Sequence, residues 1–311
     1  MKRTLVSLLA AIALLGTAYV QTRDEFNGGF SLQWSWKLPD NDPFCTLFDN
    51  AVSFGSGSMT ITTRDGAMFQ QFNSHKNVPT LRVSGDIPEE WYIETVFRTD
   101  WSTVPTDYYT QAGIVITLGA NDYFQVLITR DAFGQTPTVY GSTNSEQDNN
   151  FAWGERVTNT WTPDDQWMGV RIERVFGEDP HIVVKFRHSG TNGWIEYDGF
   201  NGARYYPDSP FYQHIMNMLS QGARIGVYTD NACGDCGLAQ PFEFDYFETN
   251  LPLLPVGDVN ADGLVDDADL LAVLFAFGSS DDCLDEDVNQ DGTVDDADLL
   301  AVLFNFGAGG E

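Results

Sequence analysis

Residues 257–278 read GDVNADGLVDDADLLAVLFAFG, and residues 286–307 read EDVNQDGTVDDADLLAVLFNFG. The copies that start at Asp258 and Asp287 are each 21 residues long and differ at three positions, so this part of the chain is an internal duplication with a period of 29 residues. Each copy joins an acidic stretch to a short apolar stretch. The pattern predicts a loop–helix unit that occurs twice.

Oxygen-bearing side chains follow the spacing of a calcium loop in both copies. Counted from the first Asp, they occupy positions 1, 3, 5, 9 and 12, and a glycine at position 6 allows a sharp turn. The main-chain carbonyl of position 7 would add a further oxygen, and calcium takes about six to eight oxygen ligands. The predicted ligands of two calcium ions are Asp258, Asn260, Asp262, Leu264, Asp266 and Asp269 in the first loop, and Asp287, Asn289, Asp291, Thr293, Asp295 and Asp298 in the second.

The charge of this segment also points to a metal. Residues 257–311 contain 13 Asp, 2 Glu and no Lys or Arg, within a chain of formal net charge −29. Such a segment repels itself unless cations neutralise it, yet its Leu, Val and Phe content distinguishes it from a disordered acidic tail. We therefore expect it to fold on a metal. The acidic composition offers no basic footprint for a nucleic acid.

The apolar residues after each loop predict a short helix. Leu270, Val273, Leu274 and Phe277 form one stripe at i, i+3, i+4 and i+7, and the same stripe in the second copy would let the two helices pack face to face. The apolar residues off this stripe have two interpretations, packing on the preceding domain or docking of a partner protein. The candidate docking residues are Leu271, Phe275, Leu300 and Phe304.

The paired loop–helix pattern resembles a type I dockerin module, with Asp in place of the usual EF-hand Glu at position 12. The resemblance covers about 50 residues and implies two bound calcium ions, attachment to a cohesin-like protein, and polysaccharide degradation as the setting. The sequence departs from the family at Asp267-Ala268 and Asp296-Ala297, where dockerins often carry a Ser/Thr-type pair, and it lacks the usual basic residues on the helix. The identity of the partner therefore does not carry over, and another copy of the chain is an alternative.

The N-terminus has the pattern of a secretory signal peptide over residues 1–18. Lys2 and Arg3 precede an apolar run at Leu5–Leu15, which is shorter than the ~20 residues that span a bilayer. We expect an extracellular or cell-surface protein without a membrane span.

Residues 24–250 predict an antiparallel two-sheet sandwich of the jelly-roll kind, because short alternating runs recur between Gly, Asn and Pro turns. A short helix is expected at Phe211–Ser220, and residues 251–256 form a short, stiff linker with two prolines. Stretches such as Asp122–Arg130 and Trp167–Arg174 resemble concanavalin A-like (laminin G-like) domains. That resemblance implies glycan binding in some relatives and, in some, a further calcium near Asp24 and Asp245.

The sequence suggests a binder more than an enzyme. Glu94 stands alone on its strand, Glu173 is flanked by bases, and no Ser-His-Asp order is evident, so no catalytic residue is assigned. A glycoside hydrolase whose acids come from separate strands is the alternative, and a self-assembling surface protein is another. Loop aromatics would stack on sugars. The candidate carbohydrate contacts are Trp101, Tyr108, Tyr109, Trp153 and Trp161.

Four cysteines, Cys45, Cys233, Cys236 and Cys283, favour disulfides over a zinc site in an exported chain, because too few other soft ligands are present. Their connectivity stays open.

Overall fold

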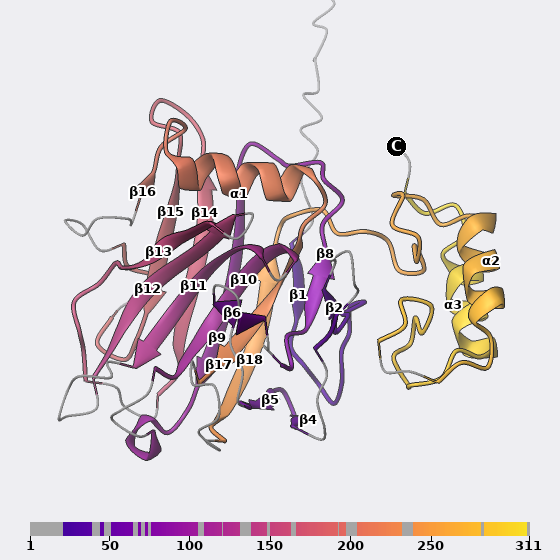
Figure 1. Ribbon diagram of the computed structural model, residues 1–311, viewed down its shortest axis with the longest axis horizontal. Helices are drawn as coiled ribbons and strands as arrows, with labels where there is room; N and C mark the ends of the chain where they lie inside the picture. The colour runs from indigo at the N-terminus through magenta and orange to yellow at the C-terminus, as the bar shows by residue number, and fades with distance from the viewer. Residues whose placement is uncertain are drawn as a thin grey trace, which may run out of the picture.

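The computed structural model describes residues 21–309 apart from short gaps at 39–43, 47–50, 65–67, 70–71, 74–75, 105–108, 120, 131–137, 148–149, 163–165, 192, 197–203, 232–238 and 281–282. The proposed signal peptide and Tyr108 lie outside the described residues. Figure 1 shows a large β body, which we call the sandwich, and a small helical part, which we call the module (residues 257–309).

One layer of the sandwich is an eight-stranded antiparallel sheet. Its first strand pairs with its last, since Asp24 lies opposite Phe247. Along the sheet the strands are β16 (Arg204–Tyr205), β15 (His181–Arg187), β14 (Met168–Val175), β9 (Trp91–Arg98), β18 (Pro241–Thr249), β5 (Met59–Thr62) and β4 (Val52–Phe54), with β1 (Thr22–Asp24) also on β18.

The second layer is a six-stranded antiparallel sheet. Its strands are, in order, β13 (Asn150–Arg156), β12 (Val139–Gln147), β11 (Asp122–Arg130), β10 (Gln111–Gly119), β17 (Arg224–Asp230) and β8 (Thr80–Arg82). Two short hairpins stand apart: β2 (Lys37–Leu38) with β3 (Phe44–Cys45), and β6 (Met68–Phe69) with β7 (Phe72–Asn73).

Large apolar side chains fill the space between the two sheets. Alternate residues such as Ile114, Val126 and Phe244 point inward and are fully buried. Helix α1 (Pro210–Ser220) lies across one end of the sandwich in Figure 1, and η1 (Trp101–Thr103) is a short 3-10 turn. The expected mainly β, two-sheet fold is confirmed.

The module consists of two loops and two helices, α2 (Asp267–Ala276) and α3 (Asp296–Phe304). Six buried valines from the two copies form its core: Val259, Val265, Val273, Val288, Val294 and Val302. Each loop forms hydrogen bonds with the segment that follows the other copy's helix. Val265 N donates to Ala308 O at 2.9 Å, and Val294 N donates to Ser279 O at 3.0 Å. The duplication therefore folds as one interlocked unit.

Hydrophobic alternation does not locate every strand. It favours a strand at residues 193–197, whose described part contributes only an isolated bridge between Ile195 and Phe186, and it does not pick out β12 and β13. The run Val139–Gln147 is rich in Gly, Ser, Thr and Asn, so its period-2 pattern carries little hydrophobic signal.

Within the described residues, no helix is long and apolar enough to cross a membrane.

Candidate functional site

The first acidic loop turns tightly around the carboxylate of Asp258. Its Oδ1 accepts a hydrogen bond from Asp262 N at 3.2 Å, and its Oδ2 accepts one from Gly263 N at 2.9 Å. The backbone is left-handed at Ala261 (φ 62°) and at Gly263 (φ 91°), where glycine carries no Cβ penalty. Asp262 N also donates to Asn260 Oδ1 at 2.9 Å, so hydrogen bonds connect positions 1, 3 and 5 of the loop.

The second loop repeats this geometry closely. Asp287 accepts from Asp291 N at 3.1 Å and from Gly292 N at 2.8 Å, and the left-handed positions are Gln290 (φ 59°) and Gly292 (φ 90°). Since the two sequence differences within the loop leave the conformation unchanged, the shared Asp, Asn and Gly positions determine it.

Each helix begins with an acidic capping box. Asp266 caps α2 by accepting from Ala268 N, and Asp269 Oδ2 accepts from Asp266 N at 2.9 Å. Asp269 Oδ1 also accepts from Asn260 N at 3.1 Å, which fastens position 12 to position 3. Asp295 and Asp298 repeat the arrangement on α3.

In each loop the first and the last predicted ligand are buried close to each other. Asp258 is 5% exposed and Asp269 is fully buried. Burial and the nearby charge of Asp269 raise the pKa of Asp258, and burial and Asp298 do the same for Asp287. Burying two carboxylates together is costly unless a cation or protons neutralise them.

The donor set fits a hard divalent cation. Both loops offer only oxygen atoms, from carboxylates, an amide and a backbone carbonyl, which suits calcium better than softer metals. In the described residues, no three Asp, Glu, His or Cys side chains already form a closed cage. Instead, the carboxylates accept backbone N–H bonds that hold the loops in shape.

Both helices present large apolar side chains to solvent. Leu271, Leu274 and Phe275 of α2 are 49%, 48% and 87% exposed, and Phe304 of α3 is 84% exposed. In Figure 1 the helices lie on the side of the module away from the sandwich, while the loops face it. We call this surface the apolar helix face, and its residues are Leu271, Leu274, Phe275, Leu300, Leu303 and Phe304.

The expected inward stripe of α2 was therefore partly wrong. Val273 is buried and Leu270 is half-buried, but Leu274 and Phe277 are about half exposed. The valines of the loops already fill the small core, so Leu274 joins Leu271 and Phe275 on the outer side at i, i+3 and i+4. The alternative that these residues pack on the sandwich is wrong as well.

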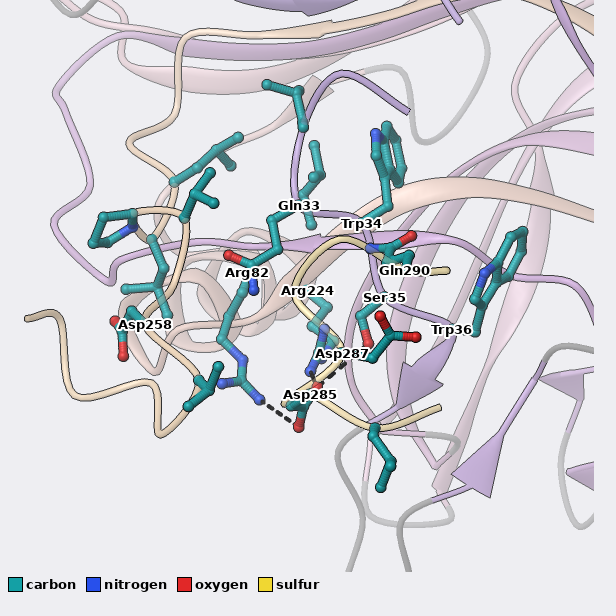
Figure 2. Close-up of a pocket in the computed structure, with 18 of the residues that line it drawn as sticks. Gln33, Trp34, Ser35, Trp36, Arg82, Arg224, Asp258, Asp285, Asp287 and Gln290 are labelled. Carbon is teal, nitrogen blue, oxygen red and sulfur yellow. Dashed lines mark hydrogen bonds and ion pairs between the residues drawn. The ribbon is translucent and has the colours of Figure 1, made fainter. Parts of the chain in front are cut away.

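A cavity of about 290 Å³ lies between the loops and the sandwich (Figure 2). Trp34, Arg82 and Arg224 line it from the sandwich, and Asp258 and Asp287, the first residues of the two loops, line it from the module. Both candidate metal loops therefore face the junction of the two parts.

The candidate carbohydrate contacts do not gather in one site. Trp101 is 2% exposed and packs edge-on against Phe242, so a sugar contact there was wrong: its ring is part of the core. The half-buried Trp161 has one face covered by the ring of His188, 4.8 Å between centroids. Tyr109 is 36% exposed and remains a candidate. Tyr108 and the side chain of Trp153 lie outside the described residues.

The sequence reasoning missed a polar face on the six-stranded sheet, opposite the core. Asp230 accepts hydrogen bonds there from Tyr228 OH at 2.5 Å and from Gln111 Nε2 at 3.2 Å. Burial raises the pKa of Tyr123, and the charges of Glu146 and Asp230 raise it further, so both carboxylates lie near this phenol. All five side chains are buried. The alternation Tyr123-x-Gln125-x-Leu127-x-Thr129 was the available signal.

Glu94 and Glu173 share one cation. Both accept hydrogen bonds from Arg171, and Glu173 also pairs with Lys185. An ion-pair network therefore holds these carboxylates on the outer face of the eight-stranded sheet.

A Ser–His–Asp chain also occurs. His214 Nδ1 lies 3.0 Å from Ser145 Oγ, and its Nε2 lies 2.5 Å from Asp122 Oδ1. Ser145 is 2% exposed, so the chain fastens α1 to the sheet and offers no accessible nucleophile.

Asp24 organises the loop that follows β1. Its buried carboxylate accepts three backbone N–H bonds and the indole Nε1 of Trp34 at 2.8 Å. These four donors occupy most of its lone pairs, which leaves little capacity for a cation. A calcium shared with Asp245 stays a prediction.

No family model matches this sequence, and no curated protein sequence matches it. The GH43 protein BlXynB of Bacillus licheniformis is structurally similar at 13% identity and a TM-score of 0.48, covering 73% of this chain and 38% of that chain. A xylan β-1,4-xylosidase of Bacillus halodurans C-125 shows 14% identity and a TM-score of 0.44 over the same shares. The carbohydrate recognition domain of Emp47p shows 15% identity and a TM-score of 0.38, covering 72% of this chain and 100% of that domain. The chain thus spans well under half the length of the first two proteins, and the likeness concerns the β-sandwich architecture alone.

Proposed function

We propose that the module is a two-calcium attachment unit, similar to a dockerin, that fastens an exported carbohydrate-binding sandwich to a protein partner. The observation that carries this proposal is the loop–helix unit, which occurs twice with the same hydrogen bonds, the same left-handed positions and the same outward apolar side chains.

Calcium would supply the charge balance that the module lacks. The module contains no Lys or Arg, and Asp258, Asp269, Asp287 and Asp298 are buried within it. The predicted ligands in each loop would hold one ion. Binding would therefore stabilise the folded module relative to its self-repelling unfolded state.

The apolar helix face would take a different protein, not a second copy. Phe275 and Phe304 are exposed anchors of the size that dominates protein interfaces. Residues 257–311 carry 15 acids and no base, and two calcium ions would remove only four of those charges, so two such modules would still repel each other. The partner we expect has an apolar centre with Lys and Arg around it, and a cohesin-like domain is the kind that the resemblance implies.

Calcium titration calorimetry on the full chain tests the first half of this proposal. We expect two binding events and a chelator-sensitive helix signal by circular dichroism. A chain that binds no calcium up to millimolar concentration would disprove it. Size-exclusion chromatography with and without calcium tests self-assembly, for which we expect a monomer in both.

For the sandwich, we propose polysaccharide binding at Tyr109, whose side chain is 36% exposed, because sugars stack on accessible aromatic rings. Affinity electrophoresis in xylan and glucan gels should show retardation of the chain. Tyr109→Ala should reduce it if this exposed ring contacts the sugar, with Phe176→Ala as the control for a partly exposed ring elsewhere.

A further inference from the structure

One acid of the module lies among three cations of the sandwich. Asp285 Oδ2 is 3.1 Å from Lys37 Nζ and 4.0 Å from Arg82 Nη2, and its Oδ1 is 3.4 Å from Arg224 Nη2. Figure 2 shows the two guanidinium groups directed at this carboxylate. We call Lys37, Arg82 and Arg224 the basic cluster. It is notable in a chain with only 16 Lys and Arg that three of them meet at one acid.

The basic cluster requires an anion to balance its charge. The side chain of Arg224 is 4% exposed, and burial, followed by the charge of Arg82, lowers its pKa to about 10. The site holds two guanidinium groups and one ammonium group where they are partly shielded from water. These three positive charges repel one another unless an anion neutralises them. The Asp285 side chain is 20% exposed and lies within ion-pair distance of all three bases, so its carboxylate neutralises part of their charge.

The contact is not a by-product of the duplication. The residue that corresponds to Asp285 in the first copy is Val256, which is 39% exposed. Only the second loop has this acid, and it stands two residues before Asp287, the first predicted ligand of that loop.

Two further connections hold the same junction. The linker pairs with the edge of the six-stranded sheet, since Leu254 N donates to Arg82 O at 3.0 Å and Ser84 N donates to Pro252 O at 2.9 Å. Cys283 is disulfide-bonded, and the other three cysteines of the sequence all precede the linker. An intramolecular disulfide from Cys283 therefore joins the module to the sandwich covalently, two residues from Asp285.

We propose that Lys37, Arg82 and Arg224 form a carboxylate-binding site of the sandwich whose ligand is Asp285, and that its occupation is coupled to calcium binding in the second loop. The inference rests on the proposed calcium function. When Asp285 is bound, the chain that leads into Asp287 is held in the loop conformation, so less ordering remains for the metal to impose. The coupling is reciprocal: calcium in the second loop strengthens the contact of Asp285 with the sandwich.

Calorimetry of calcium binding to the full, oxidised chain tests the coupling. Lys37→Gln is the decisive variant, because Lys37 belongs to the sandwich and to neither loop. It should weaken one of the two calcium-binding events by about tenfold, and Asp285→Asn should weaken the same event at least as much. Asp267→Asn removes one exposed charge from the module outside the contact and should change both events less than twofold.

Amide hydrogen exchange gives an independent measurement on the sandwich. Adding calcium should slow exchange in β8, which carries Arg82, in the unaltered chain and in Asp267→Asn, but not in Lys37→Gln. If the unaltered chain binds no calcium, the proposed function fails. If it binds two ions, and Lys37→Gln and Asp285→Asn match Asp267→Asn in both measurements, the coupling alone is refuted.

Discussion

The sandwich and the module are stabilised in opposite ways. The sandwich buries large rings, such as Trp34, Trp91 and Phe97, between two sheets, whereas the largest fully buried side chains of the module's core are valines. Apolar burial contributes about 25 cal/mol per Å² to the free energy of folding. The large core of the sandwich therefore stabilises it strongly, whereas the small core of the module contributes little. We therefore expect the stability of the module, but not that of the sandwich, to depend on what the acidic loops bind.

Removal of calcium should produce the largest difference in stability between the module and the sandwich. We expect chelation to unfold α2 and α3 completely while the near-ultraviolet circular dichroism of the sandwich's Trp residues persists, because its core contains no predicted ligand. Thermal scans with calcium and with chelator measure both parts. If chelator abolished both signals together, or neither of them, the proposed difference between the module and the sandwich would be wrong.

The next effect concerns the outer surface of the module. The double substitution Phe275→Ser and Phe304→Ser should weaken binding of a purified cohesin domain by at least ~100-fold, since buried aromatic anchors contribute about 2 kcal/mol or more each at interfaces. Stability should change little, because these rings are 87% and 84% exposed. Phe176→Ser, at a partly exposed position on the sandwich, is the matched control. Unchanged binding in the double variant would exclude the apolar helix face as the contact.

Within the sandwich, Gly113→Ala should destabilise by about 1–3 kcal/mol or more. A Cβ at Gly113 would lie 2.0 Å from the carbonyl oxygen of Val126 on the neighbouring strand. Gly55→Ala is the control, since its Cβ would meet only ordinary contacts beginning at 3.5 Å. Urea unfolding followed by Trp fluorescence measures the difference, and equal midpoints for the two variants would show that β10 and β11 are not packed as described.

The smallest effect is the pH dependence of the ion pairs on the eight-stranded sheet. Burial alone would raise the pKa of Glu173, but its hydrogen bonds with Lys185 and Arg171 lower it below the usual value. Because the folded pKa is the lower one, the stabilisation is complete above about pH 5 and disappears as the pH falls through the folded pKa. We expect about 1 kcal/mol, measured as the difference in urea unfolding between the unaltered chain and Glu173→Gln at pH 7. That difference should vanish at low pH, and a constant difference would contradict the assignment.

The sequence alone determined the local features of this protein. The acidic spacing of the loops, the glycines at Gly263 and Gly292 and the short helix after each loop depend on residues a few positions apart, so period and turn chemistry predicted them. The stretches quoted from the sequence at Asp122–Arg130 and Trp167–Arg174 correspond to strands β11 and β14 for the same reason.

Only the tertiary structure decided the features that join distant residues. It placed Trp101 in the core, turned Leu274 outward, gathered Tyr123 and Asp230 on one polar face and brought Asp285 to Arg224. The physical reason is that burial and charge balance depend on which strands and loops meet. A single sequence records the local preferences of each segment but not the partner against which its side chains are desolvated.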